Sequence, residues 1–133
     1  DLAMAALQTA ADLEPSYLDP HTILGVIAVY AGRHDIVDRE IAAIRALVPE
    51  SADPILRIAN TYLKTQNFAK TIAVYKLVVE IAPENAEYHA NLAALYKQEG
   101  LLDDAIREAR KSAELDPANY GKQAEDFLKQ LGA

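Results

Sequence analysis

Four prolines stand at a constant interval in this chain of 133 residues. They are Pro15, Pro49, Pro83 and Pro117, and 117 − 83, 83 − 49 and 49 − 15 all equal 34. A proline lacks a backbone donor and keeps the residue before it out of the helical region, so each one predicts the end of a helix. A fixed interval of this length indicates one supersecondary unit repeated along the chain.

Between the prolines, apolar residues recur at helical spacing. Val37, Ile41, Ile44 and Leu47 follow one another at steps of four, three and three, which places them on one face of a helix. Gly100 suits the left-handed position that ends many helices, and it predicts a turn in the middle of the last interval. No strand pattern is present in the sequence, so we predict an all-α chain of helix pairs.

Several helix starts are predicted from side chains that favour the N-cap position. Asp19 and Asp53 are each followed by a proline, which suits the first helical turn. Asp103 and Asn119 are predicted to cap the last two helices. We also predict an ion pair between Asp103 and Arg107, four residues apart on one helix face.

Aligned on the prolines, the intervals agree at positions where packing limits the choice of residue. The eighth position is small in each full unit, with Gly25, Ala59 and Ala93. A small residue here lets two helices approach closely. Two of the three units carry a tyrosine at the eleventh position, Tyr62 and Tyr96, and a large side chain there fills the space beside the small residue.

This pattern resembles the tetratricopeptide repeat, whose unit is a helix–turn–helix of about 34 residues. The resemblance rests on Leu24-Gly25 with Gly32, on Tyr62, and on Tyr96 with Gly100, Ala105 and Pro117. It implies a right-handed superhelical solenoid of antiparallel helix pairs, with about three and a half units and eight helices. The expected single domain contains a half unit at 1–17 with the second helix only, full units at 18–51, 52–85 and 86–119, and a C-terminal capping helix at 120–133.

Composition excludes several classes of function. The net charge of −7 argues against binding to nucleic acid or to an anionic membrane surface, which need clustered Lys and Arg. The longest apolar run, residues 23–31, is far shorter than the roughly 20 residues that cross a bilayer. The chain starts inside a helical pattern, so we expect a piece of a longer protein, and its compartment stays open.

Nothing in the sequence indicates an enzyme. His21, His34 and His89 stand at positions that other units fill with packing residues, so we interpret them as structural. No zinc-protease, phosphate-loop or nucleophile-elbow motif is present. Asp103-Asp104 is interpreted as a helix start. We therefore predict no catalytic residue, no cofactor and no metal site.

The resemblance implies a binding surface, because the first helix of each unit lines a concave groove in this family. The expected groove residues are Thr22, Val26, Tyr30, Arg57, Asn60, Lys64, Asn91, Ala94 and Gln98. Asn side chains suit a peptide backbone, and Arg or Lys suits a carboxylate. We do not expect the capture of chaperone C-terminal carboxylates, because Leu56, Gly121 and Glu125 replace three of the cations that this task needs.

The helix predicted from Pro20 to Ala31 is apolar on almost every side, which is typical of a helix that is buried all round. Its expected neighbour, the first helix of the half unit, does not occur in the chain. We therefore predict an exposed apolar interface that contacts upstream repeats, a second copy or a partner. The residues are Ile23, Val26, Ile27, Val29 and Tyr30.

The sequence thus predicts a non-catalytic protein–protein interaction module that binds a peptide or protein segment of unknown identity. The alternative is a structural or scaffolding domain of a larger protein, such as a bacterial membrane glycan polymerase or glycosyltransferase, whose chemistry lies elsewhere.

Overall fold

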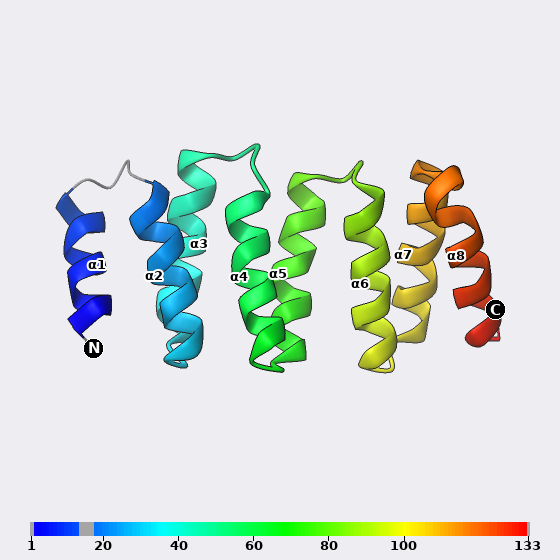
Figure 1. The fold of residues 1–133 in the computed structure, drawn as a ribbon, viewed down its shortest axis with the longest axis horizontal. Coiled ribbons are helices and arrows are strands. Elements are labelled where there is room, and N and C mark those ends of the chain that lie inside the picture. Colours follow the sequence, from blue (N-terminus) through cyan, green and yellow to red (C-terminus); the bar gives the residue numbers. More distant parts are fainter. Residues whose placement is uncertain (1, 14–17, 133) are drawn as a thin grey trace. The chain divides into compact units, whose positions relative to one another are not determined.

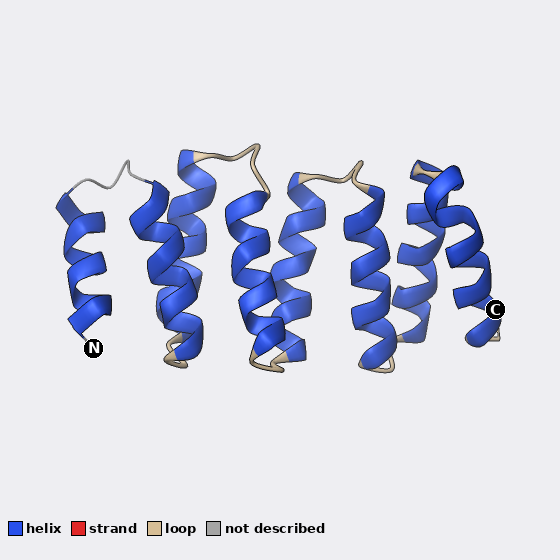
Figure 2. Cartoon of the chain, viewed as in Figure 1, coloured by secondary structure: helices blue, strands red, loops and turns tan. Residues whose placement is uncertain are grey.

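The computed structural model describes residues 2–13 and 18–132, and the described part of the chain is all-helical with eight helices (Figures 1 and 2). Contacts divide the chain into two compact parts, an N-terminal part at Asp1–Asn67 and a C-terminal part at Phe68–Ala133. The helices of the N-terminal part are α1 (Leu2–Leu13), α2 (Leu18–Tyr30), α3 (His34–Leu47) and α4 (Asp53–Lys64). Those of the C-terminal part are α5 (Phe68–Ile81), α6 (Ala86–Gln98), α7 (Leu102–Leu115) and α8 (Pro117–Gln130).

These bounds confirm the all-α fold class and the number of helices that the resemblance implies. Pro49 and Pro83 each follow the end of a helix, and Pro117 stands at the first turn of α8 directly after α7. The predicted stop at Pro15 lies outside the described residues.

The turns between the paired helices have one conformation, which recurs once in each unit. Gly32, Gln66 and Gly100 all have positive φ, at 69°, 60° and 76°. Around Gly100, the amide of Leu101 donates to the carbonyl of Tyr96 and the amide of Gly100 donates to that of Lys97. This pair of bonds is the Schellman motif, and the same two bonds recur around Gly32 and Gln66. The predicted left-handed position of Gly100 is confirmed.

In the N-terminal part, α2 lies at the centre of the packing. It contacts α1, α3 and α4, and α2 and α3 run antiparallel (Figure 1). Gly25 of α2 permits the approach of α4, because a Cβ atom added at Gly25 would lie 2.8 Å from the δ-methyl of Ile58. The surrounding core is aliphatic and fully buried, with Leu24, Ile44 and Ile55.

In the C-terminal part, α6 contacts α5 and α7, and α8 packs on α7 and α6. Small residues allow this close packing, since Ala93, Ala109 and Ala124 from α6, α7 and α8 form one buried cluster. Lys97 fastens the last helix to α6, because its Nζ lies 5.3 Å from the centre of the Phe127 ring and donates to Gln130 at 2.8 Å. The closing helix therefore has a packed face and a polar face, as its sequence indicates.

Several predicted helix starts were wrong by a few residues. Asp116 caps α8 by accepting from the amide of Asn119, so the predicted cap at Asn119 was wrong. Leu101 holds the N-cap position of α7 without a side-chain bond, and Asp103 lies inside that helix. Arg107 pairs with Asp104 at 2.8 Å, and not with Asp103 as predicted.

The two starts with proline after aspartate also differ from the prediction. α2 begins at Leu18, so Asp19 already lies in its first turn. Ala52 is the N-cap residue of α4, and Asp53 is its first helical residue. In both places the carboxylate stands near the positive end of the helix, where it stabilises the helix through the peptide dipoles instead of through a cap bond.

Gly25→Leu tests the close approach of α2 and α4. We expect a loss of about 1–3 kcal/mol in the free energy of unfolding, because a large side chain would collide with Ile58. Gly25→Ala combined with Ile58→Val is the matched control, since it removes the δ-methyl that the new Cβ would meet, and it should cost less than Gly25→Ala alone. Urea unfolding of the wild type and the three variants measures both effects, and equal midpoints would contradict the packing.

Gln66→Gly tests the repeated turn. Gln66 holds a left-handed conformation that costs roughly 1 kcal/mol for a residue with a side chain, so we expect the glycine variant to unfold at a higher urea concentration. Gly100→Gln is the mirror experiment and should lower the midpoint, because no other group lies within 4 Å of a Cβ there and the effect is conformational alone. Shifts of the same sign in both variants would refute this explanation.

Candidate functional site

One exposed face of the N-terminal part is built by α2 and α4, the first helices of their repeats. Arg57, Asn60 and Lys64 are exposed along one side of α4, while Ile58 and Tyr62 point into the core. Within residues 2–13 and 18–67, no ion pair engages the Arg57 guanidinium or the Lys64 ammonium. Two cations are therefore available to a ligand on a protein whose net charge is −7.

The same face carries apolar side chains. Ile23 and Tyr30 of α2 are 39% and 61% exposed, and Leu63 of α4 is 39% exposed. Ile23 and Arg57 hold equivalent positions of successive units, on first helices that contact each other, and so do Tyr30 and Lys64. We name the surface formed by Ile23, Val26, Tyr30, Arg57, Asn60, Leu63 and Lys64 the α2–α4 face.

Two residues predicted to lie on this surface are buried instead. Thr22 is 6% exposed, and its hydroxyl donates to the carbonyl of Leu18 within the helix. Val29 is 5% exposed, and Val26 and Ile27 are half-buried. The predicted exposed patch on α2 was therefore too wide, because α2 packs against three other helices. Ile23 and Tyr30 remain exposed, as predicted.

In the C-terminal part, Asn91, Ala94 and Gln98 are exposed along α6. Asn91 is held in place by α5, because its Nδ2 donates to the Tyr75 hydroxyl at 3.0 Å. Tyr75 is buried and also contacts the Tyr88 ring edge to face, with ring centres 6.4 Å apart. Burial raises the pKa of Tyr75, and the bond from Asn91 opposes part of that rise. None of the side chains of Asn91, Ala94 and Gln98 carries a charge.

The histidines all have packing roles with polar partners. His21 is buried in α2, with Nδ1 2.5 Å from Glu40 of α3. His89 is buried in α6, with Nδ1 2.6 Å from Glu108 of α7. Sequence reasoning missed both glutamates. The available signal was their spacing, because 89 − 21 and 108 − 40 both equal 68, which is two repeats.

His34 makes a third contact of this kind. Its Nδ1 lies 2.8 Å from the hydroxyl of Tyr62, and the two rings lie 5.6 Å apart. Burial raises the pKa of Tyr62 to about 12, and the negative charge of Asp38 adds to the rise. The hydroxyl therefore keeps its proton at neutral pH, and the contact joins the start of α3 to α4.

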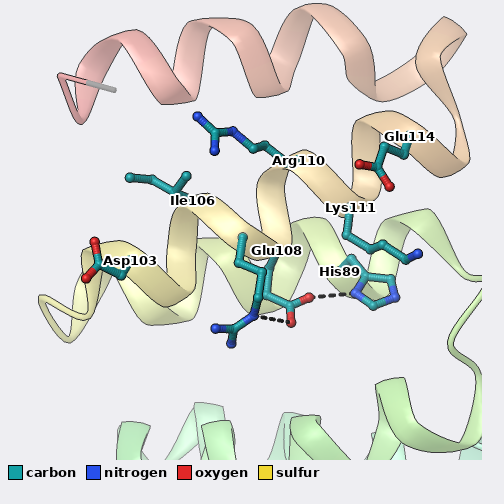
Figure 3. A pocket seen from close by; sticks show the side chains of 8 residues that line it. His89, Asp103, Ile106, Glu108, Arg110, Lys111 and Glu114 are labelled. Atoms are coloured by element: carbon teal, nitrogen blue, oxygen red, sulfur yellow. Dashed lines mark hydrogen bonds and ion pairs between the residues drawn. The ribbon is translucent and has the colours of Figure 1, made fainter.

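A hollow of about 640 Å³ lies along α7, and His89 forms part of its wall (Figure 3). His89 and Glu108 point toward one another there from α6 and α7. Its other lining side chains mix acids and bases: Asp103, Arg107, Arg110, Lys111 and Glu114, together with Ile106. Because the charges balance, the hollow favours no single class of ligand.

The part of the chain at residues 2–13 and 18–132 contains no group of three or more His, Asp or Glu side chains arranged to hold a metal ion. Within the same residues, none of the helices combines the length and the hydropathy that crossing a bilayer requires.

The comparison with protein families identifies the repeat. The family model described as "Tetratricopeptide repeat" matches residues 52–85 and 86–119, which together make up just over half of the chain. The chain belongs to the tetratricopeptide repeat family. The matched residues contain the helices α4 to α7.

Known proteins with tetratricopeptide repeats are similar at moderate identity. The small glutamine-rich tetratricopeptide repeat-containing protein beta of Homo sapiens is 26% identical over 111 residues, which cover 81% of this chain and 36% of that protein. The BBSome complex member BBS4 of Bos taurus is 29% identical over 97 residues, covering 73% of this chain and 18% of that protein. The chain thus spans about a third or less of these relatives.

Solved structures of MamA have the same fold. One crystal structure aligns with a TM-score of 0.61 at 19% identity, covering 86% of this chain and 62% of that chain. Another, of a MamA double mutant, aligns with a TM-score of 0.58 at 17% identity, covering 86% of this chain and 65% of that chain. At these identities the likeness concerns the fold alone.

The raised pKa of Tyr62 predicts a loss of stability in alkali. In the unfolded chain a tyrosine loses its proton near pH 10, whereas Tyr62 in the folded chain keeps it to about pH 12. The contribution of Tyr62 to the free energy of unfolding is therefore fully present below pH 10 and is lost as the pH rises from about 10 to 12. Urea unfolding between pH 8 and 11.5 measures this slope.

Tyr62→Phe should make that alkaline slope shallower, because the phenol that titrates is gone. Burial also raises the pKa values of Tyr75 and Tyr96, so part of the slope should persist in the variant. An identical slope in the wild type and in Tyr62→Phe would contradict the assignment.

Proposed function

We propose that this tetratricopeptide repeat chain is a non-catalytic interaction module that binds a peptide or protein segment on the exposed sides of its first helices. The observation that carries the proposal is the α2–α4 face, where cationic and apolar side chains are exposed at equivalent positions of two contacting helices. Membership of the repeat family supports it, because tetratricopeptide domains commonly bind proteins.

The chemistry of this face indicates the kind of segment. Arg57 and Lys64 suit carboxylates, which form charge-assisted hydrogen bonds with both side chains. The side-chain amide of Asn60 suits the donors and acceptors of a peptide backbone. Ile23 and Tyr30 offer apolar contact beside these polar groups, and an exposed tyrosine is a common anchor in interfaces. We infer a partner segment that carries both acidic and apolar side chains.

The C-terminal part contributes a surface of another kind. Asn91, Ala94 and Gln98 are exposed but carry no charge, and Asn91 is oriented by Tyr75. Such a surface suits hydrogen bonds to a peptide backbone and does not discriminate by charge. We infer that the α2–α4 face provides most of the charge selectivity.

A second candidate is a scaffolding role within a larger protein. It is favoured by the small share of each relative that this chain matches, for example a tenth of the TPR repeat-containing thioredoxin TTL4 of Arabidopsis thaliana, which is 27% identical over 67 residues. In such a role the repeats position a neighbouring domain, as in the predicted case of a bacterial membrane glycan polymerase or glycosyltransferase. The partner segment would then belong to the same protein or the same complex.

Binding can be tested with peptides selected from a random display library and measured by fluorescence anisotropy. We expect enrichment of sequences that combine Asp or Glu with Leu or an aromatic residue. Arg57→Ala with Lys64→Ala should weaken the selected peptides at least tenfold, because two charge-assisted contacts are worth about 1.5–3 kcal/mol each. The weakening should shrink at high salt.

Arg110→Ala with Lys111→Ala is the matched control, since it removes the same charge from exposed positions of α7. We expect it to bind as the wild type does. Equal weakening in both double variants would point to net charge instead of a site. A selection that enriches no peptide would count against the proposal as a whole.

A further inference from the structure

Two histidine–glutamate pairs join helices at equivalent places in two repeats, and all their members are buried except Glu108, which is half-buried. His21 and Glu40, which are 6% and 2% exposed, join α2 to α3 in the N-terminal part. His89 and Glu108 join α6 to α7 in the C-terminal part. We call these the two His–Glu pairs. A buried ionisable side chain is costly unless a partner compensates it, so each member of a pair depends on the other.

The geometry around His89 shows how completely this histidine is engaged. Its Nε2 lies 2.7 Å from the carbonyl of Pro83, which can only accept, so Nε2 carries a proton. Its Nδ1 lies 2.6 Å from Oε2 of Glu108, and one proton lies between these two atoms. The ring thus joins α6, α7 and the loop that precedes α6, and both of its nitrogens are used.

The second oxygen of each glutamate has the same kind of neighbour. Oε1 of Glu40 lies 3.4 Å from Nε of Arg39, and Oε1 of Glu108 lies 4.0 Å from Nε of Arg107. Both repeats therefore contain an Arg-Glu dipeptide on the second helix opposite a histidine on the first. The two His–Glu pairs are therefore alike, including the arginine that precedes each glutamate.

The repeat between them carries apolar residues at the two equivalent positions. Ile55 takes the place of the histidine, since 55 − 21 and 89 − 55 both equal 34. Val74 takes the place of the glutamate, since 74 − 40 and 108 − 74 also equal 34. Ile55 is fully buried in α4 and Val74 is 5% exposed in α5. The chemistry at these two positions therefore alternates from polar to apolar and back along the chain.

We propose that the two His–Glu pairs select which helices pair during folding. A wrong neighbouring helix would place an apolar residue against the histidine or the glutamate. A chain of similar repeats offers each helix several partners of nearly the same shape. If α4 took the place of α2 on α3, Ile55 would leave Oε2 of the buried Glu40 without the imidazole, and Arg39 would contact only Oε1. If α5 took the place of α7 on α6, Val74 would leave Nδ1 of His89 without the Glu108 carboxylate.

Only a wrong pairing of helices is destabilised, because the correct pairing of helices brings each histidine against its glutamate. Buried polar groups are known to set register and partner choice in coiled coils in this way. The pairs do not have to raise the free energy of unfolding, since well-packed apolar residues in their place often stabilise a protein as much or more. The proposal therefore concerns selectivity and can be separated from stability by experiment.

The test compares wild type with a variant in which both pairs copy the middle repeat, His21→Ile, Glu40→Val, His89→Ile and Glu108→Val. Each protein is unfolded in urea, refolded at increasing concentration and resolved by size-exclusion chromatography with light scattering. We expect the variant to melt at the same or a higher temperature, yet to give several-fold less of the species that wild type forms and additional swapped oligomers.

Thr61→Val with Ser112→Ala is the matched control. Both hydroxyls are buried and bond within their own helices, to the carbonyls of Arg57 and Ala109, so the control adds buried apolar surface without touching a His–Glu pair. It should refold as wild type does. If the four-residue variant refolds to the wild-type species in the same yield, or if the control produces the same oligomers, the proposal is wrong.

A double-mutant cycle on each pair supplies a second measurement. Glu40→Val alone should lower the melting temperature by about 10 °C or more, because it places a valine where Nδ1 of the buried His21 contacts the Glu40 carboxylate, and adding His21→Ile should restore most of the loss. The His89–Glu108 cycle should behave alike. Additive effects in both cycles would show that the pairs are not coupled and would overturn the proposal.

Discussion

The left-handed residue that ends each first helix is the constraint on which the rest of the structure depends. At Gly32, Gln66 and Gly100 the chain reverses with the same two backbone bonds. Because the reversal is identical each time, residues at equivalent sequence positions meet equivalent partners. The repeated contact of a histidine with a glutamate, in α2–α3 and in α6–α7, follows from this regularity. Two helices paired in this way leave one face of each uncovered, so further helices must pack against them.

How much the sequence could predict depends on the range of the interaction concerned. Proline stops, glycine turns and apolar spacing are local signals, and they placed the helices to within a few residues of their observed bounds. N-caps were predicted less accurately, because Asp116 and Asn119 are both good cap residues and the choice between them depends on where α7 ends. Burial of Thr22 and Val29 depends on how many helices surround α2, which no local pattern encodes.

The binding surface illustrates the same division. The resemblance to the repeat family, together with helical spacing, assigned Arg57, Asn60 and Lys64 to one side of α4, and all three side chains are exposed. The role of Tyr75 in orienting Asn91 could not be predicted from the sequence, because the hydrogen bond joins a residue of α5 to a residue of α6. The glutamate partners of the histidines were missed for a related reason. A charged residue inside an amphipathic helix is normally solvent-exposed, and only the comparison of repeats separates these two acids from the others.

The exposure of Tyr30 has an optical consequence. The chain contains seven tyrosines and no tryptophan, so its near-ultraviolet absorption and its emission come mainly from phenol rings. Tyr62, Tyr75 and Tyr96 are buried in the helical core, whereas Tyr30 is open to water on the α2–α4 face. A dissolved quencher reaches Tyr30 and is kept from those three rings. The protein thus carries a native chromophore on the surface where we place its partner, and it needs no attached dye to report contact there.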